Sequence, residues 1–382
     1  MGFNVSIDAV GTSSQTAPIK TGGAPFFNIT MLPARHGDAL WIEYGHQGAP
    51  TSRVLMDCGT TASYAHLKAR ILKVPPSERR FDLFLMSHID SDHIGGALPF
   101  LNEVDALGVR FDDLWFNGRN HLSLQRESVH QGEVFSDLIV AHKLRWNGWK
   151  KGGAIVCDDV RADHAAPSVT LRGGMKLTLL SPTRAKLTSL ADTWDEQLAP
   201  KNIALDEALE RARAPETSED VAWLADEKNR PFKEDAAAPN GSSIAVLAEF
   251  SGKRVLLGAD AHPSLLEQAI KTLLKAPGVG KKLRLDAFKV SHHGSQNNLS
   301  PALLKLIDCR NYLVSTNGSV FGHPDRVAIA RIIQNGGLQP HLWFNYRSKH
   351  NEVWAKPALQ TKYRYATTHA ANADSGLSFS LF

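Results

Sequence analysis

Four side chains that commonly bind metal ions stand within six positions, directly after a short apolar segment. The segment covers residues 81–86, and the four side chains that follow belong to His88, Asp90, Asp92 and His93. An apolar run of this length that ends at turn-forming or polar residues is typical of a buried strand. Any fold of this chain must therefore end a strand with two imidazoles and two carboxylates in one loop.

The spacing of these four side chains suits two neighbouring cations. We predict a helix over residues 94–101, so that Asp92 and His93 lie at its start while His88 and Asp90 lie in the preceding turn. Imidazoles and carboxylates both bind divalent first-row metals, and the two pairs can face two different ions. A single histidine near a strand end is usually structural, but four such side chains in one loop indicate a metal site.

The ends of two other predicted strands supply further candidate ligands. Asp260 follows residues 254–257, where its carboxylate can bridge two ions that lie about 3.5–4 Å apart. His292 and His293 follow residues 287–290. We expect His292 to bind an ion and His293 to contact the substrate or support a ligand, and the reverse order is also compatible with the sequence.

Asp57 stands at the end of residues 53–56, which form another predicted strand. Metal-binding imidazoles usually donate their second ring N–H to a carboxylate or carbonyl, which fixes the orientation of the ring. We therefore expect Asp57 to be such an acceptor, in contact with a ligand rather than with the ion.

Short apolar segments and helical patterns alternate along the chain. Strands are indicated where β-branched, aromatic or aliphatic residues run together and end at Gly, Asp, Pro or His. Helices are indicated where apolar residues recur every three or four positions. We therefore predict an α/β fold with around a dozen strands in two mixed sheets. The predicted strands are residues 26–32, 39–44, 53–56, 81–86, 114–116, 176–180, 244–250, 254–257, 287–290 and 312–315, and the predicted helices are residues 62–72, 124–144, 265–274, 301–306 and 326–333.

The composition is that of an ordinary globular protein. Of the 382 residues, 43% are hydrophobic and 21% are charged, close to the average of soluble domains. No apolar run approaches the roughly 20 residues that cross a bilayer, so a membrane protein is not expected. The three cysteines are far apart, which argues against a disulfide framework and for a reducing compartment, the cytoplasm. A net charge of +4 permits a polyanionic substrate without indicating one.

The chain is expected to form one domain with two additions. Residues 1–25 lack the basic start and apolar stretch of a secretion signal, and we predict a flexible leader before a domain of residues 26–382. Residues 184–238 are polar with few large apolar residues, and we predict an inserted helical subdomain. The insertion either decorates the surface or serves as a lid or a protein-binding element.

Residues 145–151 combine arginine and lysine with two tryptophans. Cations and indoles together can neutralise phosphates and stack on bases, which would suit nucleic-acid binding. A surface loop with partly buried indoles is the more common explanation of such a pattern.

The loop of residues 87–96 resembles the metal-binding signature of the metallo-β-lactamase family, in a His-x-Asp-x-Asp-His form. The resemblance covers residues 27–333 and is interrupted by residues 184–238. It implies a four-layer αββα sandwich of two mixed sheets, with the metal ions at one sheet edge. Three further segments are similar, in the same order, to the metallo-β-lactamase-like domain of ComEC-type competence proteins: Gly37-Asp38-Ala39, residues 291–295 and Gly322-His323-Pro324.

The chain departs from the usual family signature at two positions. Asp90 stands where the family has its second histidine, and Asn240 lies in the segment where the family has a third-motif histidine. We expect Asn240 to lie beside the ligands. Oxygen donors favour harder ions than imidazoles do. The resemblance therefore implies two divalent ions, zinc or manganese, with magnesium also permitted.

Two bridged divalent ions lower the pKa of a shared water and produce a hydroxide nucleophile near neutral pH. No Gly-x-Ser-x-Gly or phosphate-binding Gly-rich loop is present, so a covalent mechanism is not expected. Asp92, His293 and His323 are the expected catalytic residues, and both histidines are expected to contact the substrate. His323 either contacts a phosphate or protonates the leaving oxygen, or it is a structural histidine in a turn.

Three classes of function remain open. A phosphodiester suits the site because its two non-bridging oxygens can span two cations, and ComEC-type domains are associated with DNA degradation, so the resemblance implies a nuclease or a nucleotide phosphodiesterase. The second class is a metallohydrolase of a lactone, thioester or amide. The third is a non-catalytic module that binds at most one metal ion and recognises a protein through residues 184–238.

Overall fold

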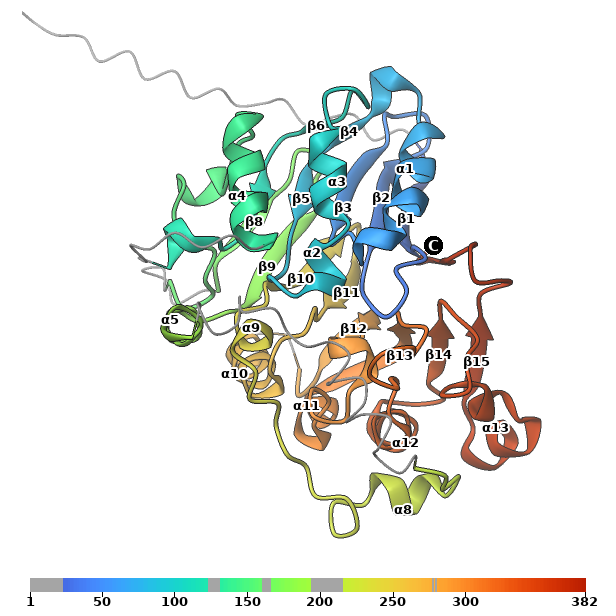
Figure 1. The fold of residues 1–382 in the computed structure, drawn as a ribbon. Coiled ribbons are helices and arrows are strands. Elements are labelled where there is room, and N and C mark those ends of the chain that lie inside the picture. The colour runs from blue at the N-terminus through green and yellow to red at the C-terminus, as the bar shows by residue number, and fades with distance from the viewer. Residues whose placement is uncertain (1–22, 123–130, 160–165, 194–215, 277, 279) are drawn as a thin grey trace, which may run out of the picture.

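The computed structural model describes residues 23–122, 131–159, 166–193, 216–276, 278 and 280–382. Two β-sheets pack face to face, and helices cover the outer face of each sheet (Figure 1). Within these residues, no helix is both long and apolar enough to cross a membrane. The predicted leader lies almost entirely outside the described residues.

The first sheet has six strands in the order β16-β1-β2-β3-β5-β7. Neighbours from β16 to β3 run antiparallel, whereas β3, β5 and β7 run parallel, so the sheet is mixed. The strands are β1 (Pro25–Met31), β2 (Leu40–His46), β3 (Ser52–Met56), β5 (Leu83–Leu85), β7 (Leu114–Trp115) and β16 (Leu377–Ser380).

The second sheet has eight strands in the order β15-β14-β13-β12-β11-β10-β9-β8. It is also mixed, because β11 to β15 run parallel and β8 to β11 run antiparallel. The strands are β8 (Ser168–Thr170), β9 (Lys176–Ser181), β10 (Ala245–Phe250), β11 (Lys253–Leu257), β12 (Leu283–Lys289), β13 (Ile307–Val314), β14 (His341–Phe344) and β15 (Ala366–His369), and a separate short ladder joins β4 (Arg80–Phe81) to β6 (Arg110–Phe111).

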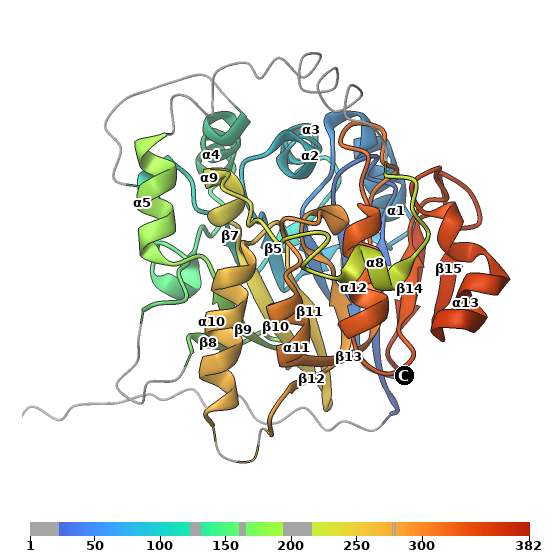
Figure 2. The same ribbon diagram turned by 90° about the horizontal axis from the view of Figure 1, so that it is seen from below.

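Helices form the two outer layers (Figures 1 and 2). Their apolar residues recur at helical spacing and face the sheets. The first sheet is covered by α1 (Tyr64–Leu72), α3 (Ala97–Asn102), α4 (Gln131–Ala141) and α5 (Arg184–Asp192), and the second sheet by α8 (Val221–Ala225), α10 (Pro263–Leu274), α11 (Pro301–Leu306) and α12 (Arg326–Asn335). The remaining α-helices are α2 (Ser91–Ile94), α9 (Ala238–Gly241) and α13 (Pro357–Tyr363), and the 3₁₀ turns are η1 (Thr61–Ser63), η2 (Pro76–Glu78), η3 (Arg119–His121), η4 (Gly148–Lys150), η5 (Ser291–Gly294) and η6 (Glu352–Ala355).

Three clusters of buried side chains fill the spaces between the four layers. The central cluster lies between the sheets and joins Ile42 of β2 to Val246 of β10. One outer cluster packs Phe84 of β5 against the helices of the first sheet, and the other packs Phe288 of β12 against the helices of the second. Burial of apolar surface on both faces of both sheets is what holds the layers together. The predicted αββα sandwich of two mixed sheets is confirmed.

The predicted helix at residues 94–101 is divided between α2 and α3. The division falls at Gly95 and Gly96, where the chain passes close to the loop after β3. A Cβ on Gly96 would lie 2.2 Å from the carbonyl oxygen of Cys58, and a Cβ on Gly95 would lie 2.8 Å from the backbone nitrogen of Thr61. This contact between distant segments is absent from the local pattern, which is why the sequence predicts an unbroken helix.

The predicted strand at residues 81–86 is divided at Asp82. The carboxylate of Asp82 accepts hydrogen bonds from the Tyr44 hydroxyl at 2.5 Å and from the Gly173 N–H at 2.9 Å. These contacts hold the chain between β4 and β5 and lead β4 into its own short ladder with β6.

The described ends of the predicted insertion pack on different helical layers. Leu187 of α5 belongs to the outer cluster of the first sheet, whereas Leu224 of α8 belongs to that of the second. The predicted helix at residues 124–144 is described only from residue 131, as α4, and residues 194–215 of the insertion lie outside the described residues.

Candidate metal centre

The ends of several strands meet at one edge of the sandwich. Asp57 follows β3 and His88 follows β5 in the first sheet, while His93 lies on α2. Asp260 follows β11, and His293 lies on η5, which follows β12 in the second sheet. Residues more than two hundred positions apart therefore share one buried neighbourhood, as the strand-end pattern predicts.

A carboxylate oxygen of Asp260 lies at the centre of this neighbourhood. Its Oδ2 atom is 3.4 Å from His93 Nε2, 3.7 Å from His88 Nε2, and 3.8 Å from Nε2 of both His292 and His293. Asp260 is buried, and its Oδ1 atom has no hydrogen-bond partner among the described residues. Four imidazoles thus converge on one buried carboxylate.

Asp57 orients the imidazole of His93. The Nδ1–H group of His93 donates to Asp57 Oδ2 at 2.9 Å, and Asp57 also accepts from the backbone N–H and the hydroxyl of Ser87, both at 2.7 Å. Because Asp57 holds one ring proton on Nδ1, loss of the other proton leaves a lone pair on Nε2, which faces the cluster. This is the tautomer that binds a metal ion through Nε2.

Ser87 links Asp57 to His88 through its hydroxyl group. The Ser87 hydroxyl gives its only hydrogen to Asp57, so at 2.9 Å it accepts a hydrogen bond from His88 Nδ1. His88 Nε2 is then an acceptor that is buried, lacks a hydrogen-bond partner among the described residues and lies 3.5 Å from Asp90 Oδ2. Asp57 therefore fixes two imidazoles, one directly and one through a hydroxyl.

His293 is held by the main chain at the end of β13. Its Nδ1–H group donates to the carbonyl oxygen of Ser315 at 2.9 Å. Its Nε2 atom lies 3.2 Å from Asp92 Oδ2 and 3.3 Å from His93 Nε2. The geometry therefore places His293 next to Asp92 and His93, while His292 Nε2 is equally far from Asp260 Oδ2, so both orders of the two histidines stay predictions.

His292 is held by an amide network on the other side of Asp260. Its Nδ1–H group donates to Asn298 Oδ1 at 2.8 Å. The side-chain amides of Asn298 and Asn240 both donate to Asp235 Oδ2, at 3.0 and 2.7 Å. Asn240 Nδ2 also lies 3.4 Å from His292 Nδ1, while Asn240 Oδ1 is buried and has no partner among the described residues.

Three site residues adopt backbone conformations that residues other than glycine rarely occupy. The φ angle is 58° at Asp57, 46° at His292 and 54° at His293. Such a conformation costs about 1–3 kcal/mol per residue and persists only where surrounding contacts hold it, most often at functional sites. Here the hydrogen bonds of the three side chains supply those contacts.

The donor set fits divalent cations. Ligand atoms of His88, His93 and Asp260 lie within 4.8 Å of one another, and so do ligand atoms of Asp38, His93 and His293. The Nε2 atoms of His93 and His293 are 3.3 Å apart, and two lone pairs at this distance repel unless a proton or a cation lies between them. Neutral imidazoles combined with carboxylates are the donors that zinc and manganese prefer.

Without ions, the carboxylates keep protons on the imidazoles. Burial lowers the pKa of His293, but the carboxylates of Asp38 and Asp260 outweigh it and raise that pKa to about 10. The same competition raises the pKa of His292 to about 9 and the pKa of His93 well above its usual value. The cluster therefore carries a negative potential that attracts positive charge.

Asp90, Asp92 and His323 complete the predicted set. Asp92 lies on α2 beside His293, and Asp90 is the partly exposed residue that precedes this helix. His323 is half-buried, and its ring centroid lies 5.4 Å from that of His292. The structure thus brings every predicted site residue to this edge, while their individual roles stay predictions.

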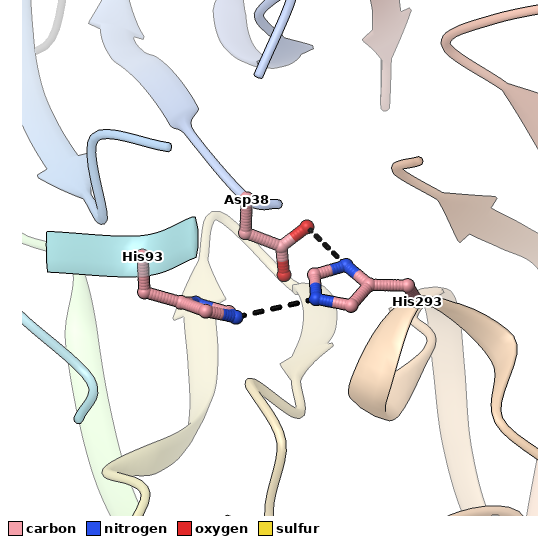
Figure 3. A group of neighbouring side chains, drawn as sticks. All are labelled: Asp38, His93 and His293. Carbon is pink, nitrogen blue, oxygen red and sulfur yellow. Dashed lines mark hydrogen bonds and ion pairs between the residues drawn. The ribbon is translucent and has the colours of Figure 1, made fainter. Parts of the chain in front are cut away.

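Sequence reasoning did not identify Asp38 and Lys289 as parts of the site. Asp38 Oδ1 lies 3.4 Å from His293 Nδ1, and Figure 3 shows Asp38 above the facing rings of His93 and His293. Asp38 lies in Gly37-Asp38-Ala39, one of the segments that carry the family resemblance, and this resemblance could have identified it as a site residue. Lys289 ends the strand β12, which also carries Arg284 and Asp286, and nothing in the local pattern separates it from a surface lysine. Asp235 was also missed, because the polar segment around it is typical of a solvated surface.

The indoles in residues 145–151 are used in packing. Trp146 Nε1 donates to the carbonyl oxygen of Phe116 at 2.8 Å, and the ring of Trp149 stacks on that of Trp115 with centroids 5.0 Å apart. Both rings are half-buried. Packing therefore accounts for both tryptophans.

A model of the family described as "Metallo-beta-lactamase superfamily" matches residues 34–318. The metallo-beta-lactamase fold protein YhfI from Bacillus subtilis is 12% identical with a TM-score of 0.40, and the match covers 92% of this chain and 99% of that chain. Zn(2+)-bound PqqB from Methylobacterium extorquens is 13% identical with a TM-score of 0.41 and the same two coverages, 92% and 99%. A diphosphatase from the PhnP family is 11% identical with a TM-score of 0.38, covering 94% of this chain and 98% of that chain. No curated protein matches the chain in sequence.

Proposed function

The chain belongs to the metallo-beta-lactamase superfamily, and from this premise we propose that it is a hydrolase that activates water between two divalent metal ions. The observation that supports this most directly is the convergence of four imidazole Nε2 atoms on Asp260 Oδ2. Every one of these rings has its Nδ1 atom held by an acceptor on its far side. Ligands oriented in advance in this way are typical of a metal centre whose geometry is fixed by the fold.

The carboxylate of Asp260 would bridge the ions, because the Nε2 atoms of four imidazoles lie around its Oδ2 atom. When bound, the ions lower the pKa of a shared water and stabilise charge on the attacked group. Zinc or manganese fits the mixed donors, and magnesium is also permitted. The residues that would hold the first ion are His88 and Asp90, and those that would hold the second are Asp92, His93 and His293. His292 would be a further ligand, because its Nε2 atom also faces Asp260.

The proposed substrate is a phosphodiester, in a nucleic acid or a smaller nucleotide. His323 stands at the half-exposed side of the cluster, where its imidazole can donate a proton to a leaving oxygen. His36 and Phe321 are half-buried beside it, with ring centroids 6.1 Å apart, and offer aromatic surface for a base. The resemblance of three short segments of the sequence to ComEC-type competence proteins is a further reason to propose a nuclease or nucleotide phosphodiesterase.

Hydrolysis of a substrate panel tests this function. Protein loaded with Mn²⁺, Zn²⁺ or Mg²⁺ is incubated with single-stranded DNA, double-stranded DNA, RNA and bis-(p-nitrophenyl) phosphate, and in parallel with a lactone, a thioester and an amide. We expect at least one phosphodiester to be cleaved, and we expect a chelator to abolish the cleavage.

The outcomes separate the three classes of function. Protein that contains two ions and cleaves only carbonyl substrates would place the chain among lactone, thioester or amide hydrolases. Protein that stays folded and binds no divalent ion would contradict the hydrolase itself and favour a non-catalytic module.

A further inference from the structure

Lys289 places a buried ammonium group beside the candidate metal centre. It lies on β12, is 0% exposed, and stands in register between Leu257 of β11 and Leu313 of β13. Its Nζ atom donates to Asp38 Oδ2 at 2.6 Å and to the carbonyl oxygen of Val290 at 3.0 Å. A charge at the centre of a sheet is costly to remove from water, and a hydrophobic residue is often at least as stable there. Packing alone therefore does not explain why a lysine occupies this position.

Asp38 connects this ammonium group to His293. One carboxylate oxygen of Asp38 accepts from Lys289, and the other lies 3.4 Å from His293 Nδ1. The Nδ1–H group of His293 donates to the carbonyl oxygen of Ser315, and the Asp38 carboxylate lies beside this group as an ion-pair partner, with its Oδ1 atom accepting no hydrogen bond among the described residues. The resulting series of contacts runs from the ammonium group through a carboxylate to an imidazole whose Nε2 faces the cluster.

The main chain also fixes Asp38 in place. Its N–H group donates to the carbonyl oxygen of Asp92 at 3.2 Å, and its carbonyl oxygen accepts from the Gly59 N–H group at 2.7 Å. Asp38 is therefore held between the segment that carries Asp92 and the loop after β3. Its carboxylate has little freedom to turn toward another partner.

The ammonium group makes Asp38 a poor ligand for a metal ion. A divalent ion bound to Asp38 would share one carboxylate with a buried cation, and like charges repel strongly in a low-dielectric interior. His293 also presents its protonated Nδ1 to Asp38 and keeps the Nε2 lone pair for the cluster. The proximity of Asp38 to His93 and His293 is thus better explained by support than by coordination.

We propose that Asp38 is a positioning residue for the second ion of the centre, and that Lys289 is the counter-charge that keeps Asp38 in this supporting role. Asp38 orients His293, and Lys289 neutralises Asp38 and keeps this carboxylate from binding an ion itself. The inference rests on the proposed function in one respect, namely that the centre binds two ions.

A double-variant cycle tests the proposal. Wild type, Asp38→Asn, Lys289→Met and the double variant are compared by titration with Co²⁺ and by unfolding in urea. Each single variant leaves one buried charge without its partner, so both should unfold at a lower urea concentration than wild type. The double variant replaces the ion pair by a neutral pair of similar size and should recover most of the wild-type midpoint.

The affinity for the second Co²⁺ is expected to follow a different order. It should fall about 10- to 100-fold in Asp38→Asn and stay as low in the double variant, because His293 has lost its carboxylate partner in both. Lys289→Met keeps that carboxylate and should bind the second ion at least as tightly as wild type. Lys253→Met is the matched control. It breaks a half-exposed ion pair with Asp286 at 3.1 Å and should leave the affinity for both Co²⁺ ions unchanged.

Each alternative result overturns the proposal in a recognisable way. Wild-type affinity for the second ion in the double variant would show that the pair serves only folding. An equal loss of affinity for the second ion in both single variants would show that the Asp38 carboxylate does not act on His293 independently of Lys289. A wild-type protein that binds no Co²⁺ would overturn both this inference and the proposed function, whereas two tightly bound ions with unchanged variants would overturn this inference alone.

Discussion

Asp260 is the residue on which the proposed chemistry depends most. Its Oδ2 atom is within 3.8 Å of four imidazole nitrogens, and its Oδ1 atom is buried without a partner among the described residues. An unsatisfied buried carboxylate oxygen is expensive to keep, and a bound cation would satisfy it.

Asp260→Ala should therefore remove both metal binding and hydrolysis. The expected change is from two divalent ions per chain to none, measured by elemental analysis of the purified variant after dialysis. His121→Ala is the control, because this half-buried histidine contacts Asn147 and Trp146 rather than the cluster. Full activity of Asp260→Ala would refute the bridging role.

A second prediction concerns the residue that holds two ligands at once. Asp57→Asn removes the charge that accepts from His93 and from Ser87, and it should weaken metal binding about 10- to 100-fold. Asp113→Asn is the matched control, since Asp113 is also a buried carboxylate with several hydrogen bonds, to Trp115, Gly148 and Trp149, away from the cluster. Isothermal titration with Zn²⁺ compares the two variants, and an equal loss in both would show that Asp57 acts only through stability.

The sequence identifies the ligand-type residues but not the supports that orient them. His88, Asp92, His93 and Asp260 stand at strand ends, where a local pattern is visible. The partner of His293 is a backbone carbonyl 22 positions away, and that of Asp38 is Lys289, 251 positions away. Contacts of this kind depend on how β12, β13 and the β1–β2 loop meet, which no single segment encodes.

At the level of elements, the β1–β2 loop is pressed against the metal-binding segment. A Cβ on Gly37 would lie 1.7 Å from the carbonyl oxygen of Asp92, so only glycine allows this approach. The neighbouring hydrogen bond from the Asp38 N–H group to the same oxygen shows how closely the two segments meet.

Gly37→Ala should thus destabilise the fold and disturb the centre together. We expect the free energy of unfolding to fall by about 1–3 kcal/mol, as for overpacked core sites, with weaker metal binding. Gly153→Ala is the milder comparison, because the nearest atom to its Cβ would be the Lys150 carbonyl oxygen at 3.2 Å, a tight contact that needs only a small shift, and it lies away from the cluster. Denaturant unfolding with and without Zn²⁺ measures both effects, and a Gly37→Ala variant as stable as wild type would contradict the close contact.

Most strands near the site could be predicted because each is a short apolar run that ends at a turn residue. The strands β14, β15 and β16 were not predicted, although they extend both sheets at their edges. β16 completes the first sheet by pairing with β1, more than three hundred residues earlier in the chain. Edge strands of this kind have weak apolar patterns, and their pairing partner rather than their own sequence decides their conformation.

At the level of the whole molecule, the metal-free protein should respond to pH in a characteristic way. The raised pKa values of about 9 for His292 and about 10 for His293 exceed the unfolded value of 6.5. Protons on these rings therefore stabilise the metal-free fold fully below pH 6.5, and this contribution is lost as the pH rises through 9 to 10. Asp92 and Asp260 have lowered pKa values, so their contribution is lost in acid.

We accordingly expect the melting temperature of the metal-free protein to fall between about pH 7 and pH 10, and ion binding to tighten over the same range as protons leave. Thermal melts with and without Zn²⁺ at several pH values measure both trends. A metal-free protein whose stability rises toward pH 10 would contradict the conclusion that protonated His292 and His293 stabilise the metal-free fold.

Two cations are expected to lie on either side of Asp260, where the ends of the two sheets meet. Anomalous diffraction from crystals grown with Zn²⁺ or Mn²⁺, recorded at the absorption edge of the metal, locates such ions directly. Two peaks about 3.5–4 Å apart are expected, one next to His88 and the other next to Asp92 and His293. Crystals of folded protein with no peak at Asp260, or with peaks only elsewhere, would contradict this expectation.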